Sequence, residues 1–242
     1  MPRSQLANAN TRPPSEVISH YLEAIFYMRA EGELVRSARL ADWLSVSRPT
    51  VTIAIRRMVR DGIVRQTLRK DIELTSRGLA AAEAIVRRHR IVERWMTDML
   101  GLDWVTADLE AERLEHAISA VVEDKLYRAL GRPMTCPHGN PIPGYSTMLA
   151  DELRLSALRP GEPATITRIS EVAQREAPPL LQYLHERGLR PGTPIMVEEL
   201  DEVGRTMKLR AARVLTLSYE TASKLSVVRS AKPRRRRADA PR

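Results

Sequence analysis

The sequence begins with apolar residues at helical spacing. Between residues 15 and 31 they recur every three or four positions and predict a helix capped by Ser15: Ile18, Leu22, Ile25 and Phe26. A shorter helix is predicted to follow Ser37 as its cap. A third follows Ser47, with Pro49 in its first turn and Gly62 at its end. Two short helices joined by a tight turn, the second capped and basic, are typical of a helix-turn-helix motif.

Two short alternating segments, 63–68 and 72–75, flank a charged turn at 69–71 and predict a β-hairpin. We therefore expect a winged helix-turn-helix domain over residues 15–75, after a flexible N-terminus 1–14. Its small hydroxyls and one apolar side chain suit thymine methyls and phosphates, but these groups are not the bidentate donors that read guanine most strongly. We expect modest base readout and much phosphate contact. The candidate DNA-binding residues are Ser47, Arg48, Pro49, Thr50, Thr52, Ile53, Arg56, Arg57, Arg60, Arg65 and Lys70.

A long helix is predicted from Thr75, and the segment DLEAERLEHAIS, residues 108–119, is expected to form one further helix. At about 100° per residue, its polar and apolar residues fall in opposite sectors. The polar sector holds Asp108, Glu112, Glu115 and His116, and the apolar sector holds Leu114, Ala117, Ile118 and Val121. Such a polar sector usually just faces water.

The alternative is that this sector forms half of a metal site. His89 and Glu93 lie one turn apart on the preceding predicted helix, and an antiparallel helix pair can bring them against the acidic segment. His20 and Glu23 are also neighbours on the first helix. Three separate segments thus offer metal-ligand types in helical register, a combination more specific than any one of them alone.

Charge is distributed unevenly over the 242 residues, whose net charge is +9. Residues 36–70 carry +7 and residues 229–242 carry +6, which leaves about −4 for the remainder. This distribution favours a polyanionic partner over a protein-binding winged helix. The basic tail is either a solubilising extension or a clamp on DNA phosphates. A single cysteine, no signal-peptide pattern and no long apolar run predict a cytoplasmic protein.

The C-terminal third changes in character. Residues 131–147 are rich in proline and glycine and predict a surface crossing, in which Cys136 and His138 are interpreted as loop residues because no second cysteine is near. Short strands punctuated by glycine then predict a small SH3-like barrel. The expected fold is mainly α with β: a helical metal-binding and dimerisation domain at 76–145, a linker at 146–158, the SH3-like (FeoA-like) domain at 159–229 and a disordered basic tail at 230–242.

The chain resembles the diphtheria-toxin-repressor family of metal-dependent repressors over most of its length. The resemblance rests on HYLEAI, SRPTVTIAIRRMVRDGIV, LTSRGLAAAEAIVRRHRIVER, EAERLEHAISAVVEDKL and HGNPIPG. It implies a homodimer that represses metal-homeostasis genes by placing two recognition helices on a palindromic operator of double-stranded DNA. The metal ligands that the resemblance implies are His20, Glu23, His89, Glu93, Asp108, Glu112, Glu115 and His116, with Glu176 as a further candidate and Pro179 where iron regulators have a glutamine.

The same resemblance bears on the metal. Iron-responsive members carry cysteine at the position of Glu112, and manganese-responsive members carry glutamate, so Mn²⁺ is expected. His20 departs from both subgroups, which leaves Fe²⁺, Zn²⁺ and Co²⁺ as alternatives. Two other functions suit the sequence less well. A metallohydrolase would want an HExxH motif, a phosphate loop or a nucleophile elbow, none of which the sequence contains. A repressor with an organic effector would leave the acidic cluster as plain surface.

Overall fold

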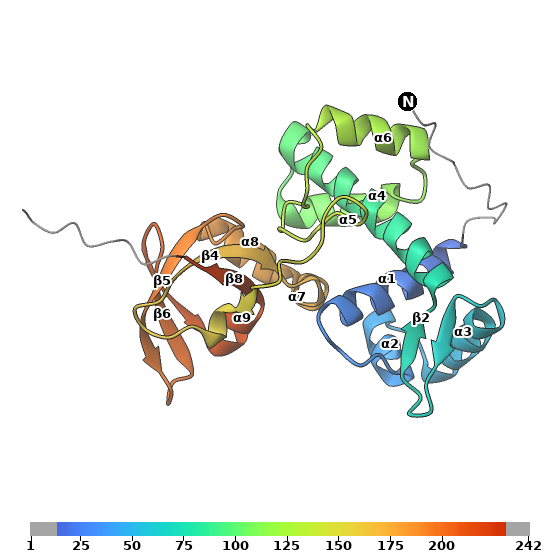
Figure 1. Cartoon of the computed structure of the whole chain (residues 1–242), viewed down its shortest axis with the longest axis horizontal. Helices are drawn as coiled ribbons and strands as arrows, with labels where there is room; N and C mark the ends of the chain where they lie inside the picture. The colour runs from blue at the N-terminus through green and yellow to red at the C-terminus, as the bar shows by residue number, and fades with distance from the viewer. Residues whose placement is uncertain (1–13, 231–242) are drawn as a thin grey trace, which may run out of the picture. The chain divides into compact units, whose positions relative to one another are not determined.

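The computed structural model describes residues 14–230, apart from the side chains of residues 175, 176 and 178. The chain forms two compact units that divide between Ala82 and Glu83. The division falls inside helix α4 (Ser76–Leu100), which belongs to both units (Figure 1). The predicted tail beyond residue 230 and the N-terminal residues 1–13 lie outside the described part of the chain.

The first unit is the predicted winged helix-turn-helix. It contains α1 (Glu16–Ala30), α2 (Ser37–Leu44), α3 (Arg48–Arg60), β1 (Val64–Gln66) and β2 (Ile72–Leu74). The Ser47 side chain caps α3 by accepting from the Thr50 amide at 3.2 Å, as predicted. The prediction that Ser37 caps α2 is wrong, because Ser37 is already helical and Arg36 holds the cap position. The fully buried side chains that unite the helices include Leu22, Ile25, Met28, Leu40, Ile55 and Met58.

The wing is a short antiparallel hairpin in which Val64 pairs with Leu74 and Gln66 with Ile72. Hydrogen bonds among Thr67, Lys70 and Asp71 close its turn. The Lys70 amide donates to the Thr67 carbonyl at 2.9 Å, and the Asp71 amide donates to the Thr67 hydroxyl at 3.1 Å. Lys70 therefore adopts a left-handed backbone conformation, with φ of 62°. The two strands stand beside α3 in Figure 1.

The helical part of the second unit comprises the rest of α4 with α5 (Trp104–Leu114) and α6 (Ala120–Ala129). The expectation of one helix over residues 108–119 is wrong, because α5 ends at Leu114 and Ser119 caps a new helix. Of the predicted apolar sector, Ile118 packs against the helical core, but Leu114, Ala117 and Val121 are exposed. The residues of α5 that pack against Val92 and Met96 of α4 are instead Ala107 and Ala111.

The interruption between α5 and α6 is held by contacts from α4. The Arg88 guanidinium donates to the carbonyl oxygen of Glu115 at 2.9 Å. Arg87 and Arg88 both donate to the carboxylate of Glu123 on α6, at 2.7 and 3.3 Å. A backbone carbonyl that would accept a hydrogen bond within a continuing helix is thus taken by a side chain from a neighbouring helix. Periodicity within the segment carries no sign of this tertiary contact.

The C-terminal part of the second unit is an antiparallel six-stranded sheet in the order β3-β8-β4-β5-β6-β7. It is the predicted FeoA-like domain. Its strands are β3 (Leu153–Arg154), β4 (Pro163–Ile169), β5 (Pro194–Asp201), β6 (Thr206–Arg210), β7 (Val214–Ser218) and β8 (Leu225–Arg229). The helices are η1 (Leu155–Ala157), α7 (Glu171–Glu176), α8 (Pro178–Glu186) and α9 (Tyr219–Ser223). Trp104 of α5 belongs to the same apolar core as Leu181 and Leu184 of α8.

The loop before this domain is not the surface crossing that its composition predicted, because residues 136–143 are buried. The Ile169 amide donates to the His138 carbonyl at 2.9 Å, and the Asn140 side chain donates to the Ile169 carbonyl at 3.0 Å. This loop therefore packs along the end of β4.

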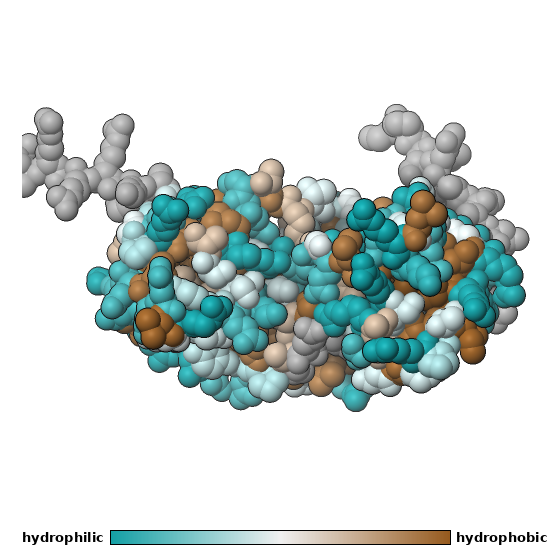
Figure 2. Space-filling view, turned by 90° about the horizontal axis from the view of Figure 1, so that it is seen from below, coloured by the Kyte–Doolittle hydropathy of each residue, from teal (hydrophilic) through white to brown (hydrophobic). Residues whose placement is uncertain are grey.

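Hydrophilic residues dominate the face drawn in Figure 2, with hydrophobic residues interspersed in small groups. Among the described residues, no helix combines the length and apolar character needed to span a membrane.

Candidate metal centre and DNA-binding surface

His89 on α4 is the centre of a group of carboxylates. Its Nε2 lies 3.3 Å from Oδ1 of Asp108 on α5, and its Nδ1 lies 2.8 Å from Oε2 of Glu115. The second carboxylate oxygen of Glu115 lies 3.4 Å from Nε2 of His116. Glu115 is fully buried, and its Oε1 makes no hydrogen bond within the described residues. The sequence predicted that His89 meets the acidic segment, and it does so at Asp108 and Glu115; His116 lies beside Glu115.

The carboxylates around His89 determine its protonation. Burial alone would lower the pKa of His89, but hydrogen bonds to Asp108 and Glu115 outweigh it and hold that pKa well above 6.5. The imidazole is therefore protonated near neutral pH in the metal-free protein. A metal ion that took this position would displace the proton and neutralise the repulsion between the carboxylates.

A second buried group surrounds Glu93, one helical turn beyond His89. One ligand atom each from Glu93, Cys136 and His138 lie within 4.8 Å of one another, and all three residues are buried. Oε1 of Glu93 and Nδ1 of His138 are 2.7 Å apart, yet neither atom has the geometry of a hydrogen bond. Buried oxygen, nitrogen and sulfur atoms this close together can serve as ligands of one cation, and without a cation Glu93 and His138 form an ion pair. Glu93 also falls in one group with His89 and Asp108.

The pKa values of this second group reflect its burial. Burial, reinforced by the nearby carboxylate of Glu93, raises the pKa of the Cys136 thiol well above 9.0. Burial would lower the pKa of His138, but the Glu93 carboxylate more than compensates and the pKa is raised. From the sequence, Cys136 and His138 were expected to be loop residues without a metal. The signal that could have identified them is their spacing two residues apart, together with Glu93 on α4, which was already among the predicted ligands.

A carboxylate from the FeoA-like domain lies close to this group. Arg90 donates to Oε1 of Glu171 at the start of α7 through Nε at 3.0 Å. Burial raises the pKa of Glu171 against the opposing effect of Arg90, and its Oε2 is buried with no hydrogen bond within the described residues. Glu171 was not predicted. The predicted candidate, Glu176, is the last residue of α7, and its side chain lies outside the described residues.

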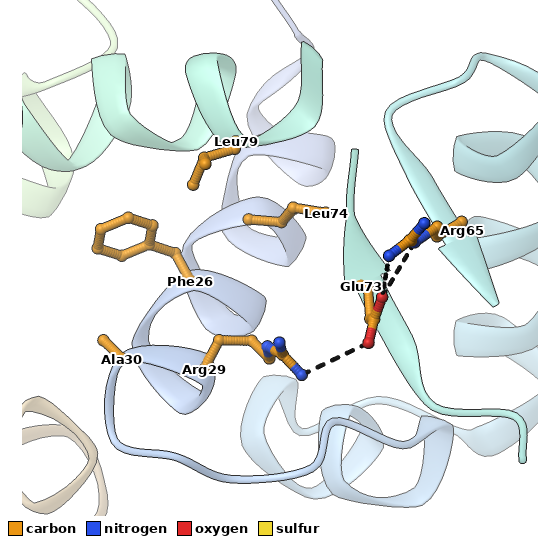
Figure 3. Close-up of a pocket in the computed structure, with 7 residues that line it drawn as sticks. All are labelled: Phe26, Arg29, Ala30, Arg65, Glu73, Leu74 and Leu79. Atoms are coloured by element: carbon orange, nitrogen blue, oxygen red, sulfur yellow. Dashed lines mark hydrogen bonds and ion pairs between the residues drawn. The ribbon is translucent and has the colours of Figure 1, made fainter. Parts of the chain in front are cut away.

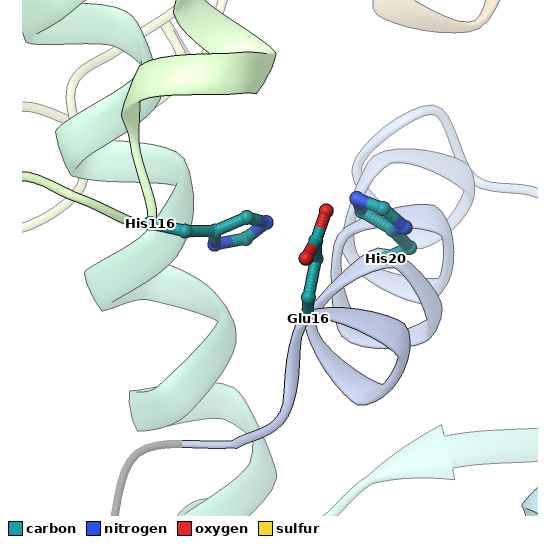
Figure 4. Close-up of side chains that lie close together, drawn as sticks. All are labelled: Glu16, His20 and His116. Atoms are coloured by element: carbon teal, nitrogen blue, oxygen red, sulfur yellow. The ribbon is translucent and has the colours of Figure 1, made fainter.

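The remaining predicted ligands lie on single helices. Glu112 is on α5, one turn beyond Asp108. His20 and Glu23 are on α1 in the first unit, where Glu16, His20 and Glu23 follow one another at intervals of four and three residues. Figure 4 shows Glu16 and His20 on the same side of α1, and His116 just after the end of α5.

The predicted DNA-binding residues of α3 form an exposed face. Arg48, Pro49, Thr50, Ile53 and Arg56 are exposed; Arg57 and Arg60 are exposed too and lie 3.7 Å from Asp61. Lys70 is exposed at the wing turn. Thr52 is half-buried, and its hydroxyl donates to the Arg48 carbonyl at 3.0 Å. This face combines cationic and apolar side chains, as phosphate and base contacts require.

Arg65, a predicted DNA-binding residue, forms an ion pair within the wing. Its guanidinium donates twice to Oε2 of Glu73 across the hairpin, at 2.9 and 2.7 Å, and Glu73 also lies 3.7 Å from Arg29 of α1. These residues border a pocket of about 400 Å³ between α1, the hairpin and the start of α4, whose apolar side is formed by Phe26, Ala30, Leu74 and Leu79 (Figure 3). The ion pair holds the wing strand in place, so Arg65 supports the DNA-binding face structurally.

Comparison with known families accounts for almost the whole described chain. Residues 15–71 match the iron dependent repressor, N-terminal DNA binding domain. Residues 75–144 match the iron dependent repressor, metal binding and dimerisation domain, and residues 153–229 match the FeoA domain.

Individual relatives give the same result. The iron-dependent repressor IdeR of Mycobacterium tuberculosis is 34% identical over 218 residues, covering 86% of this chain and 94% of the relative. The diphtheria toxin repressor of Corynebacterium diphtheriae is 33% identical over 195 residues, covering 75% and 84%.

Solved structures also match. A manganese-dependent transcriptional repressor in complex with manganese has a TM-score of 0.79 at 29% identity, covering 88% of this chain and all of that one. IdeR of T. acidophilum has a TM-score of 0.73 at 26% identity, covering 91% and all of that chain. The chain belongs to the diphtheria-toxin-repressor (iron-dependent repressor) family of metal-dependent, DNA-binding transcriptional repressors.

Proposed function

We propose that this protein is a dimeric repressor of metal-homeostasis genes that Mn²⁺ activates. The observation that supports it best is the group around His89, where Asp108 and Glu115 approach the imidazole nitrogens at 3.3 and 2.8 Å. The donors of this group are oxygen and nitrogen atoms, the ligand types that suit a hard to borderline divalent cation. The proposed ligands are His20, Glu23, His89, Glu112, Glu115 and His116, with Glu93 and Asp108 beside them.

Glu112 supports manganese over softer metals. A carboxylate at this position suits Mn²⁺, whereas a thiolate would favour softer ions. One relative named above is an iron-dependent repressor and one similar structure contains manganese, so the metal assignment rests on this chain's own ligands. Fe²⁺, Zn²⁺ and Co²⁺ are the alternatives, because His20 adds nitrogen character to the set.

A second metal site at Glu93, Cys136 and His138 is part of the proposal. The approach of Glu93 to His138 at 2.7 Å, the closeness of Cys136 and the complete burial of His138 support it. Glu171 is the carboxylate of the FeoA-like domain that can join them. A thiolate here makes this site softer than the first, and a bound cation would lower the pKa of Cys136 enough to deprotonate it.

Metal binding is proposed to switch DNA affinity through α1. His20 and Glu23 belong to the winged unit, whereas His89, Glu112, Glu115 and His116 belong to the helical part, so a shared ion would restrict the winged unit. Without metal, the carboxylates repel one another and this restriction is lost. Because the two binding events are linked, operator DNA must raise metal affinity by the same factor by which metal raises operator affinity.

The dimer is proposed to form through the helical part of the second unit. Exposed apolar side chains occur there on all three helices: Met99 and Leu100 on α4, Leu109 on α5, and Val121 and Val122 on α6. A two-fold dimer would present two α3 helices to successive half-sites of a palindromic operator. The metallohydrolase alternative is set aside, since the family consists of repressors and not enzymes.

Metal selectivity is tested by DNA binding. Metal-stripped protein and operator DNA are mixed at fixed salt, and fluorescence anisotropy is followed while Mn²⁺, Fe²⁺, Co²⁺ or Zn²⁺ is added. We expect Mn²⁺ to activate at micromolar concentration. Glu112→Cys should raise the Mn²⁺ concentration needed by at least about tenfold and lower that of Zn²⁺ or Co²⁺.

Glu110→Cys is the matched control. Glu110 lies on the same helix but pairs with exposed Arg113, so this variant should respond to metals as the wild type does. Activation of the wild type by Fe²⁺ or Zn²⁺ but not by Mn²⁺ would refute the manganese assignment. If none of the metals changes DNA binding, the proposal that this protein is a metal sensor is refuted.

A further inference from the structure

Ile53 occupies an unusual place on the recognition helix. Its side chain is 68% exposed, although α3 is anchored by the buried residues Val51, Ile55 and Met58. At about 100° per residue, Ile53 lies roughly opposite Val51 and Ile55 around the helix axis. It therefore sits in the middle of the outward face of α3, where most of its side chain faces water in the free protein.

The polar groups beside Ile53 are largely engaged within the helix. The hydroxyls of Ser47 and Thr50 are 2.7 Å apart, and Ser47 also accepts from the Thr50 amide. The Thr52 hydroxyl donates to the Arg48 carbonyl at 3.0 Å. These hydroxyls already have partners, so the outward face has few unused short polar groups with which to read a base edge.

The charges on this face are placed at its flanks. Arg56 and Arg57 follow Ile53 at three and four residues, one on either side of it along the helix surface. Arg57 lies 3.7 Å from Asp61, and Arg56 makes no ion pair with any described residue. Two arginines flanking an apolar tip suit a groove in which phosphates lie at the edges and base edges at the floor.

We propose that Ile53 reads the 5-methyl group of thymine in the major groove and is the main base-specificity determinant of this chain. The inference rests on the proposed function, since it requires α3 to enter operator DNA. The thymine methyl is the one apolar group that an unmodified base pair presents in the major groove. Contact with it would remove both the methyl and the exposed isoleucine from water, whereas cytosine, adenine and guanine offer no such partner.

Uracil provides the test, because it differs from thymine only by this methyl group. An operator is selected from random duplexes with the metal-loaded full-length protein, and each thymine of a half-site is then replaced singly by deoxyuridine. At one or two positions we expect the wild-type affinity, measured by fluorescence anisotropy, to fall about fourfold, as for one buried methyl group. Ile53→Ala should bind the thymine operator more weakly and show no further loss with uracil at those positions.

Val59→Ala is the control variant. Val59 lies on the same helix and is 42% exposed, but it is about 120° away from Ile53 around the axis. It should keep the full uracil effect, and the melting temperatures of both variants should stay near that of the wild type.

Equal uracil effects in the wild type and Ile53→Ala, or no effect at any thymine, would overturn the inference while leaving the metal-dependent repressor intact. Failure of the metal-loaded wild type to bind any duplex would overturn both.

Discussion

His89 shows how one residue can couple metal binding to protons. It lies within hydrogen-bonding distance of two carboxylates, and these hold its pKa well above 6.5 despite its burial. The metal-free site therefore contains an internal cation, the imidazolium, that partly balances Asp108 and Glu115. A metal ion must replace this proton before it can bind the nitrogen. The site thus exchanges a proton for a divalent metal ion.

We predict that metal binding releases a proton from His89. At pH 7, calorimetric titration of Mn²⁺ in two buffers of different ionisation enthalpy should report release of about one proton per His89. His89→Gln should release less. Below the raised pKa of His89, the apparent metal affinity should fall by up to about tenfold per pH unit.

With rising pH, the stability of the metal-free protein and that of the Mn²⁺-bound protein should change in opposite directions. Because the folded pKa of His89 is raised, its contribution to metal-free stability is complete below the unfolded value near 6.5 and is lost as the pH rises through the folded pKa. The contribution of His89 to the melting temperature of the metal-free protein should therefore disappear as the pH rises. Over the same pH range, saturating Mn²⁺ should stabilise the fold by an increasing amount. Identical proton release by the wild type and His89→Gln would contradict this account.

At the scale of elements, the sequence predicted the winged unit well because its signals are local. Ser47, Pro49 and Gly62 mark the ends of α3 by chemistry that acts within a few residues. The alternating segments of the wing likewise pair across a short turn. The same reasoning failed at residues 108–119, where apolar spacing suggested one helix and the wrong buried sector.

The failures share a physical cause. The end of α5 depends on Arg88 of another helix, which binds the carbonyl of Glu115. The burial of Cys136 and His138 depends on β4 and α4, both distant in sequence from the loop. Short-range patterns do not encode such contacts. They identified His89, Asp108, Glu115 and His116 as a group but missed Glu171 and the grouping of Cys136 with His138.

Glu123 of α6 gives a prediction at this scale. It accepts from Arg87 and Arg88, and Arg88 in turn holds the carbonyl of Glu115, next to His116. Glu123→Gln should free Arg88 and loosen this turn. We expect metal affinity at the His89 group, measured by competition with a chelating dye, to fall about tenfold, as for other residues that orient metal ligands.

The neighbouring residue supplies the control for Glu123. Asp124 pairs with Arg128 on the exposed side of α6, so Asp124→Asn should leave metal affinity unchanged. Glu123→Asp, which keeps the charge, should restore part of the loss. If Glu123→Gln lowers the melting temperature but binds metal as tightly as the wild type, then Glu123 only stabilises the fold and does not position the metal ligands.

On the scale of the second unit, the loop at 136–143 joins the helical part to the FeoA-like sheet. Arg90 of α4 donates both to Glu171 and to the carbonyl of Pro141, and Arg168 of β4 donates to the side-chain oxygen of Asn140 at 3.4 Å. The loop also contains Cys136 and His138 of the proposed second metal site. Occupancy of that site and attachment of the FeoA-like domain should therefore depend on one another.

Gly139 is the position where this dependence can be tested. Its φ is +85°, and a Cβ there would lie 2.0 Å from the carbonyl oxygen of Thr167 on β4. Gly139→Ala should therefore push the loop away from the sheet. Because Cys136 is the only cysteine in the chain, any sulfur-to-Co²⁺ charge-transfer band in the near ultraviolet reports on this site. We expect the wild type to show this band and Gly139→Ala to lose it, while Mn²⁺ still binds the His89 group.

Gly144 is the control that distinguishes the steric clash with Thr167 from the strain of a left-handed backbone. Gly144 follows Gly139 in the chain and has the same φ of +85°. A Cβ added there would come no closer than 3.5 Å to the Arg87 side chain. Gly144→Ala thus introduces similar conformational strain, of about 1 kcal/mol, without displacing the loop. It should lower the melting temperature slightly and keep the charge-transfer band. Loss of the band in both variants would mean that backbone strain alone disrupts the site, and retention in both would mean that docking of the loop on β4 does not position Cys136.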